Sequence, residues 1–403
     1  MIYLGMVVLP VGLAIWTAAY LHGLELQGVW FEADARLART AIQMVEWEMD
    51  AAGPALARGA GPIEGADPSP WAARAASAGG TVVILEPGVR DLFVALYMPG
   101  DSGGVSMARA GVGLPVARAM ASVAGYELAL YLDGIRQAVT DLSFGPETLD
   151  PGVTRRATVL MDGIPFRLED GRRAAMVPRA APRAGDTHLM ALAAPASPRR
   201  RPLTGPFALL ALALMGSMLA LRIVTWMGPL IPSSRWSRRW TDRALGVIPV
   251  MVAMAALLNV ATRYRDDVER YTEDTLAREL ALAGTLGGEV EASRLGEITG
   301  YHATRLAGNQ VSSSTLSDGP VLESIRDMVG PAPGRRVTGR FEAQGQTVAF
   351  AASRGEADET LILTHETDST AVRGFTLRLA GLGLLLLVLV LLFPTYEPNV
   401  LYE

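Results

Sequence analysis

The chain of 403 residues contains no cysteine, and all of its 36 basic residues are arginine. The lack of cysteine excludes disulfides, thiolate metal sites, iron–sulfur clusters and cysteine nucleophiles. The lack of lysine excludes Schiff-base chemistry and the phosphate-binding lysine of a P-loop. Charge is also sparse, since 19% of the residues are charged and the net charge is −5. No overall basic field favours nucleic acid as a partner.

Apolar residues are abundant and make up 50% of the chain. A transmembrane helix needs about 20 mostly apolar residues, and four stretches meet this requirement. A secretory signal peptide is the alternative for the first, which lacks a basic leading region and a clear cleavage site, so a retained anchor is favoured. The predicted spans are residues 2–24, 203–231, 244–262 and 374–394.

A short arginine-rich loop, residues 232–243, separates the second and third predicted spans. Short basic loops stay on the cytoplasmic side, so residues 25–202 and 263–373 are predicted to be extracytoplasmic, with a tail at 395–403. This predicts a multi-pass protein of the bacterial inner membrane with both large segments in the periplasm. The arginines expected to contact lipid or a protein partner are Arg222, Arg235, Arg238, Arg239 and Arg378.

The two large segments resemble each other, which predicts an internal duplication. Each begins with a polar helix that continues from its span, and each then reads as a strand, a turn and a second strand. The matched features are Gly125-Tyr126 with Gly300-Tyr301, Asp133-Gly134 with Gly308-Asn309, and the loops 142–146 and 316–320.

Further strands are expected after these loops, in ATVLMDGIPFRLED and HLMALAAP of the first segment and in RVTGRFEAQGQTVAFAAS and ETLILTHE of the second. The first segment also carries an inserted region at about 53–110, with a Gly/Ala/Pro-rich linker near Gly53–Pro70. Two strands are expected there, around Pro87-Gly88.

The order of span, long helix, sheet and returning span resembles the bacterial Cache and PAS-like extracytoplasmic sensor domains. The resemblance rests on GYELALYLDGIRQAVTDLS and GYHATRLAGNQVSSSTLS and is closest to the input half of multi-pass sensor histidine kinases. It implies an α+β membrane protein with four transmembrane helices and two such domains, each a long helix plus an antiparallel sheet. The chain departs from those kinases because only PTYEPNVLYE follows the fourth span, which suggests a short end without an output domain.

If the domains keep a small-ligand pocket, the resemblance places it against the sheet, beyond the repeated Gly-Tyr. The residues expected to line it are Tyr126, Tyr131, Thr140, Tyr301 and Arg305. Aromatic rings and an arginine suit a carboxylate or amine ligand. Packing of the sheet is the alternative role for these tyrosines.

No catalytic, metal or cofactor set emerges from the remaining residues. The four histidines lack metal-ligand spacing, and Asp101-Ser102-Gly103-Gly104 has no accompanying protease motifs. A non-enzymatic protein with no cofactor is therefore expected, acting through a protein partner and binding membrane lipid and a small molecule. The alternative is an accessory or scaffolding subunit of a larger membrane complex, for example an energy-converting or photosynthetic assembly.

Overall fold

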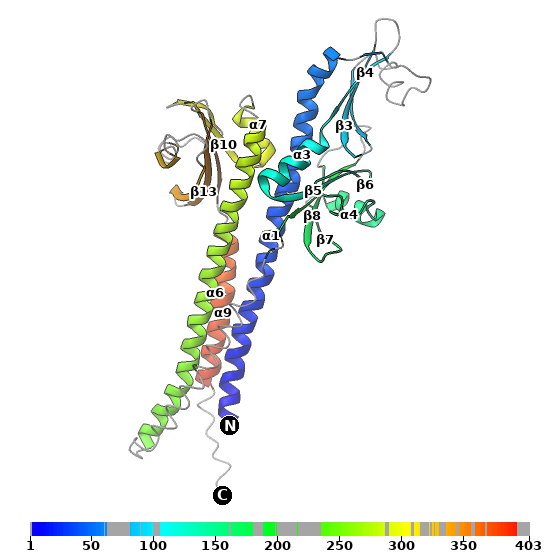
Figure 1. The fold of residues 1–403 in the computed structure, drawn as a ribbon. Helices are drawn as coiled ribbons and strands as arrows, with labels where there is room; N and C mark the ends of the chain where they lie inside the picture. Colours follow the sequence, from blue (N-terminus) through cyan, green and yellow to red (C-terminus); the bar gives the residue numbers. More distant parts are fainter. Residues whose placement is uncertain are drawn as a thin grey trace. The chain divides into compact units, whose positions relative to one another are not determined.

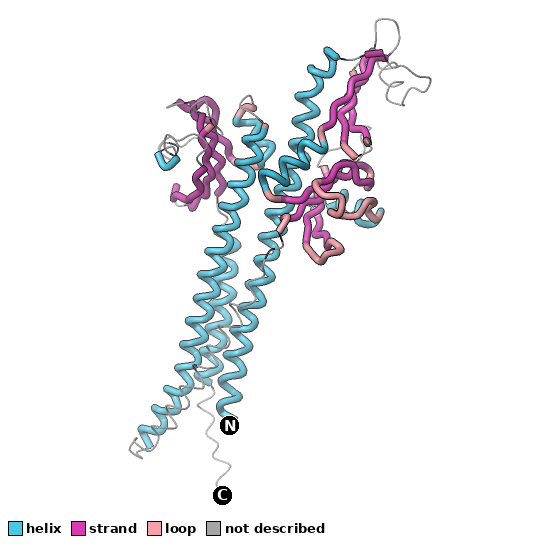
Figure 2. The backbone as a smooth tube through the Cα atoms, in the orientation of Figure 1, coloured by secondary structure: helices cyan, strands magenta, loops and turns pink. Residues whose placement is uncertain are grey.

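The computed structural model describes residues 2–59, 61–62, 81–88, 90–99, 105–160, 163–179, 188–197, 199, 216, 235–286, 290–307, 310–314, 322, 325, 327–329, 336–343, 346–355, 359–366 and 369–392. The chain forms two compact units. The helical unit comprises Met1–Val29, Arg200–Tyr271 and Thr367–Glu403, and the sheet unit comprises Trp30–Arg199 and Thr272–Glu366. The described part contains both helices and strands (Figure 2), and its strand pairs are antiparallel, so the predicted α+β class is confirmed.

Two long helices each contribute residues to both units. Helix α1 is Ile2–Gly59 and helix α6 is Arg235–Thr285, and Figure 1 shows both as unbroken helices. The predicted continuity of each apolar stretch with the polar helix that follows it is confirmed for both, whereas the apolar stretches are not confirmed as membrane spans. Two boundaries were wrong: α1 runs through residues 53–59 of the expected linker, and residues 235–243 of the expected loop are helical. Each residue added to the end of an existing helix gains an i to i−4 backbone hydrogen bond. This gain outweighs the preference of glycine and polar residues for loops.

The helical unit joins α1 and α6 to a third helix, α9, which is Ser369–Leu392. A small cluster of buried residues from all three helices holds them together, with Ile15 and Ala253 exposed by at most 1% and Leu386 by 3%. Small side chains such as alanine let helices approach closely. The other faces carry apolar side chains in the open, including Leu377 (72% exposed) and Leu384 (62%).

Among the residues that the structure describes, one helical segment, Thr370–Val388, is long and apolar enough to cross a membrane. It covers most of the fourth predicted span. The second predicted span, residues 203–231 with Arg222, lies outside the described residues except for Gly216. The number of four spans is therefore not confirmed.

The first five-stranded sheet begins after a helical segment, α3 (Gly113–Ala119) and the π-helical η1 (Met120–Ala124). Its order is β6-β5-β9-β8-β7, and all pairs are antiparallel. The predicted hairpin at Asp133-Gly134 is confirmed, with φ of 50° and 81° at the two residues, as a tight turn with left-handed residues requires. The strands are β5 (Tyr126–Leu132), β6 (Ile135–Val139), β7 (Ile164–Arg167), β8 (Arg173–Pro178) and β9 (Leu189–Pro195).

One predicted strand of this sheet was partly wrong. ATVL lies at the end of helix α4, Pro151–Leu160, and the strand begins only at Ile164. Asp150 starts the helix, because its carboxylate accepts a hydrogen bond from the Gly152 amide at 2.6 Å. Capping of this kind offsets the weak strand preference of a short valine-containing run.

The second five-stranded sheet has the order β11-β10-β14-β13-β12 and follows helix α7, Ala292–Thr299. If the strands of each sheet are numbered along the chain, both sheets have the order 2-1-5-4-3. The expected strands in RVTGRFEA, QTVAFAAS and ETLILTHE are confirmed, while residues 308–309 and 315–320 lie outside the described residues. The strands are β10 (His302–Ala307), β11 (Gln310–Ser314), β12 (Arg336–Ala343), β13 (Gln346–Arg354) and β14 (Glu359–Glu366).

The inserted region forms a third sheet of order β1-β4-β3-β2. The two strands expected around Pro87-Gly88 are confirmed as β2 (Val82–Pro87) and β3 (Leu92–Pro99), which pair in antiparallel register. Two strands of this sheet were missed, β1 (Gly61–Pro62) and β4 (Val105–Gly111), as was β8 in the first five-stranded sheet.

The two five-stranded sheets and the two long helices share one large hydrophobic core. It contains Leu37 and Val45 of α1, Leu276 of α6, Leu128 of the first sheet and Leu363 of the second, none of them exposed. Each five-stranded sheet therefore turns one face to the α1 and α6 helices. The opposite faces have separate clusters, which include Tyr131 and Leu192 in the first sheet and Phe350 and Ile362 in the second.

Candidate functional site

The five residues predicted to line a pocket do not gather in one place. Tyr126 lies in the shared core, whereas Tyr131 lies on the opposite face of the same strand. The Tyr131 hydroxyl donates to the Pro146 carbonyl oxygen at 2.9 Å. The Thr140 hydroxyl oxygen accepts a hydrogen bond from the Leu128 amide at 3.1 Å, which extends the β5–β6 edge. These two side chains are occupied by contacts within the first sheet.

Tyr126 belongs to a buried polar cluster that joins the first sheet to α1. Its hydroxyl donates to the Asp34 carboxylate at 2.7 Å, and Asp34 is 3% exposed. Arg199, which follows β9, donates to both Asp34 oxygens at 2.8 and 3.0 Å and to the Tyr126 hydroxyl oxygen at 2.7 Å. A two-pronged contact between arginine and carboxylate is the strong form of this interaction. Through this cluster, the chain segment that follows the first sheet is held against α1.

The guanidinium of Arg278, from α6, lies 5.1 Å from the centre of the Tyr126 ring. The first Gly-Tyr tyrosine is therefore contacted by both long helices. Burial raises the pKa of the Tyr126 hydroxyl, and the neighbouring Asp34 carboxylate adds to this rise. Burial also raises the pKa of Asp34, although Arg199 and Tyr126 oppose the shift.

Tyr301, the second Gly-Tyr tyrosine, has a related environment. The guanidinium of Arg36, from α1, lies 5.4 Å from the centre of its ring. The His365 ring meets it edge-on, at 5.2 Å between ring centres. Burial and the Glu279 carboxylate raise the pKa of Tyr301 to about 12. The remaining predicted residue, Arg305, forms an ion pair with Glu359 at 3.3 Å on the neighbouring strand.

Glu279 of α6 is the most deeply buried acidic residue of this region, with none of its surface exposed. Its Oε1 lies 3.0 Å from the Thr40 hydroxyl of α1. Its Oε2 is buried without a hydrogen-bond partner. Desolvation raises its pKa to about 8, against the lowering effects of Thr40 and Arg36. A carboxyl group with this pKa holds a proton over most of the neutral range.

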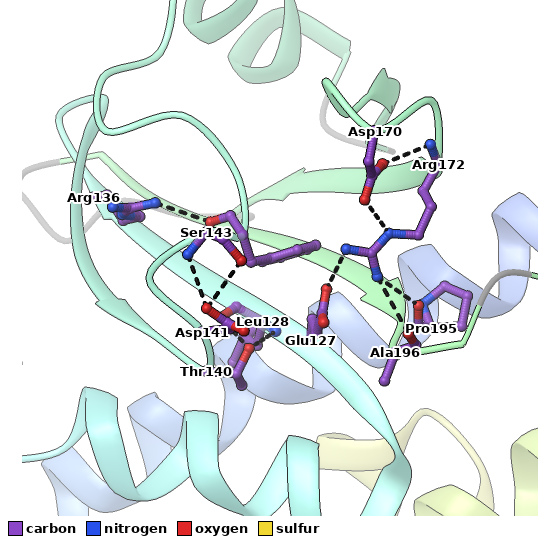
Figure 3. Close-up of polar contacts among 11 residues, drawn as sticks. Glu127, Leu128, Arg136, Thr140, Asp141, Ser143, Asp170, Arg172, Pro195 and Ala196 are labelled. Carbon is purple, nitrogen blue, oxygen red and sulfur yellow. Dashed lines mark hydrogen bonds and ion pairs between the residues drawn. The ribbon is translucent and has the colours of Figure 1, made fainter.

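The outer face of the first sheet is closed by polar contacts among its own residues (Figure 3). Arg172 points between Asp170, 2.5 Å away, and Glu127, 2.7 Å away. Arg136 donates to the carbonyl oxygens of Phe144 and Gly145, at 3.0 and 2.7 Å. These arginines fix the 140–150 loop and the β7–β8 turn over the apolar cluster, which fits a structural role.

The arginines predicted to contact lipid or a partner are only partly described. Arg378 of α9 forms an ion pair with Glu25 of α1 within the helical unit, so it has an intrachain partner. Near it, His22 of α1 lies 3.3 Å from the carboxylate of Asp267 of α6. Arg235, Arg238 and Arg239 belong to the first turns of α6.

The sequence patterns identify both Gly-Tyr tyrosines but not the charged residues that surround them. These are Asp34, Arg36, Arg199, Arg278 and Glu279. Four of these lie on α1 or α6, where charged residues read as solvent-facing positions of a polar helix. Among the described residues, no group of three or more histidine, aspartate or glutamate side chains is arranged to hold a metal ion. Comparison with known protein families gives no match for the chain, and no curated protein matches it either.

Proposed function

We propose that this chain is a non-enzymatic, multi-pass inner-membrane protein whose two extracytoplasmic sensor-like domains act through a partner protein. The observation that carries the proposal is the strand order 2-1-5-4-3 in both five-stranded sheets. Each sheet follows a helical segment and packs on the α1–α6 helix pair through one core. This agrees with the duplicated Cache or PAS-like architecture of the resemblance.

Membrane attachment is supported by the apolar surface of the helical unit. Thr370–Val388 has the length and hydropathy of a span, and α9 presents Leu377, Leu384 and Leu385 with 56–72% of their surface exposed. Exposing so much apolar surface to water is unfavourable at about 25 cal/mol per Å², whereas lipid removes that cost. The further spans at residues 2–24, 203–231 and 244–262 complete the proposed topology.

An accessory or scaffolding subunit of a larger membrane complex is the second candidate. It is favoured by the contacts of the predicted pocket residues, because Tyr126, Tyr131 and Thr140 are all hydrogen-bonded within the chain. A domain whose polar groups are satisfied internally is suited to a rigid structural role. In this case the sheets provide binding surfaces for a protein rather than pockets for a small molecule.

Purification from native membranes in a mild detergent separates the two candidates. A free sensor-like protein is expected as a small particle whose melting temperature rises with L-amino acids or short carboxylates. A subunit is expected to copurify with fixed partners in constant stoichiometry and to show no such rise. A small particle with no thermal response and no specific partner in crosslinking would contradict both.

A further inference from the structure

The helices α1 and α6 match each other in sequence at a constant separation. Along both helices the residues that match are 239 positions apart, as in 249 − 10 for the two prolines and 278 − 39 for two arginines. Identical residues include Val8, Pro10, Val11 and Ala14 with Val247, Pro249, Val250 and Ala253, and Leu37-Ala38-Arg39 with Leu276-Ala277-Arg278.

The residues that follow this shared tripeptide contact each other in the sheet unit. Thr40 and Glu279 are again 239 positions apart, and the Thr40 hydroxyl lies 3.0 Å from Glu279 Oε1. Leu37 and Leu276, one turn earlier, are both fully buried in the same core. A contact between equivalent positions of two copies is what a two-fold axis produces in a symmetric dimer.

The two Gly-Tyr tyrosines show a related exchange, although Arg36 lies one helical turn before Arg39, the residue equivalent to Arg278. Arg278 of α6 lies over Tyr126 of the first sheet, and Arg36 of α1 lies over Tyr301 of the second. An arginine of each long helix thus contacts the Gly-Tyr tyrosine of the other half. In both halves the preceding glycine has a left-handed φ, 66° at Gly125 and 70° at Gly300.

We infer that the two halves of this chain pair as the subunits of a symmetric dimer would, about an axis at Thr40–Glu279, and that a proton on the Glu279 carboxyl maintains this pairing. The inference goes beyond the proposed function and does not depend on it. It makes the α1–α6 contact a proton-binding element of the sheet unit.

The geometry around Thr40 supports a protonated Glu279. The Thr40 hydroxyl has one hydrogen but lies near two oxygens, Glu279 Oε1 at 3.0 Å and the Ile298 carbonyl of α7 at 3.5 Å. Both contacts become hydrogen bonds if Glu279 donates its proton to Thr40 and Thr40 donates to Ile298. An ionised Glu279 would leave a buried negative charge with one oxygen unpartnered.

The other polar groups that face Glu279 do not neutralise its charge fully. Arg36 from α1 is the nearby positive charge, and it is shared with Tyr301 and Glu32. Tyr301, just before β10, is neutral at physiological pH, and burial raises its pKa further above that range. Burial therefore dominates, and the pKa of Glu279 rises from 4.5 to about 8.

The sign of the pH effect follows from this rise. The folded chain binds more protons at Glu279 than the unfolded chain does between the two pKa values. The stabilisation is fully present below the ordinary pKa of 4.5 and is lost as the pH rises through about 8. The pairing of the halves should therefore weaken progressively as the pH rises from about 5 to about 8.

The test is thermal unfolding of the full chain in mild detergent, from about pH 5 to about pH 9. The melting temperature of the wild type should fall progressively from about pH 5 to about pH 8 and level off above that, while that of Glu279→Gln should fall clearly less. Glu297→Gln, which alters an exposed carboxylate on α7, is the control and should follow the wild type. If Glu279→Gln has the same pH profile as the wild type, the proton plays no role and the inference fails.

The symmetry is tested by exchanging the two residues across the axis. The double variant Thr40→Glu with Glu279→Thr moves the carboxyl to the equivalent position and should restore the wild-type melting temperature and pH profile. Thr40→Glu alone puts two carboxyl groups together and should melt at a lower temperature, most of all at high pH. A double variant that is no more stable than Thr40→Glu alone would show that the positions are not equivalent.

Discussion

Replacing Arg199 by alanine should destabilise the sheet unit strongly. The substitution removes two hydrogen bonds to Asp34 and one to Tyr126 and leaves the Asp34 carboxylate, 3% exposed, without its positive partner. Loss of one member of a buried ion pair costs about 3–5 kcal/mol, because the remaining charge stays buried. Arg199 is itself partly exposed, with 17% of its side-chain surface accessible, so the lower end of this range is expected.

The assay is urea unfolding of the full chain in mild detergent, followed by circular dichroism. The matched control is Arg294→Ala, which removes an arginine from an ion pair with Asp50 that is 41% and 46% exposed. An exposed pair of this kind contributes less than about 1 kcal/mol. Adding Asp34→Asn to Arg199→Ala should recover part of the lost free energy of unfolding, because it removes the stranded charge. Equal losses of unfolding free energy for Arg199→Ala and Arg294→Ala would show that the buried pair with Asp34 contributes no more than an exposed one.

Other substitutions test the packing of the two halves and the backbone of the Gly-Tyr turn. Leu37→Ala and Leu276→Ala, at equivalent buried positions of one core, should each lower the free energy of unfolding by about 2–5 kcal/mol in the same urea assay. If the losses for the two variants differ by more than the width of this range, the two leucines are not packed equivalently. Gly125→Ala should cost about 1 kcal/mol for its left-handed φ alone, because its Cβ would enter open space. Gly145→Ala should cost measurably more by melting temperature, since its Cβ would lie 2.6 Å from the Tyr131 hydroxyl; equal losses would argue against that contact.

Local signals in the sequence were sufficient for much of the fold. Apolar runs and polar periodicity predict α1, α6 and α9, and the Asp133-Gly134 pair predicts the β5–β6 hairpin. The errors arose where one local preference competes with another, as at residues 157–160, where a short valine-containing run continues a helix capped by Asp150. Strand β8, rich in alanine, has weak strand propensity and is held by its neighbours β7 and β9.

The site was harder to predict because its partners are remote in sequence. Tyr126 is hydrogen-bonded to Asp34, which lies 92 positions away in the sequence, and Thr40 is hydrogen-bonded to Glu279, 239 positions away. The repeated glycine and tyrosine marked the right strands, but strand alternation places Tyr126 and Tyr131 on opposite faces. The likeness of α1 and α6 at a separation of 239 is the signal that could have located the shared helix pair.

The proposed topology places both sheet domains on the same, extracytoplasmic side of the inner membrane. Because the chain has no cysteine, single cysteines can be introduced at exposed sites, Glu147→Cys in the first domain and Glu297→Cys in the second. Their side chains are 90% and 63% exposed. In intact cells with a permeabilised outer membrane, a membrane-impermeant maleimide should label both variants and should leave Arg238→Cys unlabelled until the inner membrane is broken. Protection of either domain in intact cells would place that domain in the cytoplasm and overturn the proposed topology.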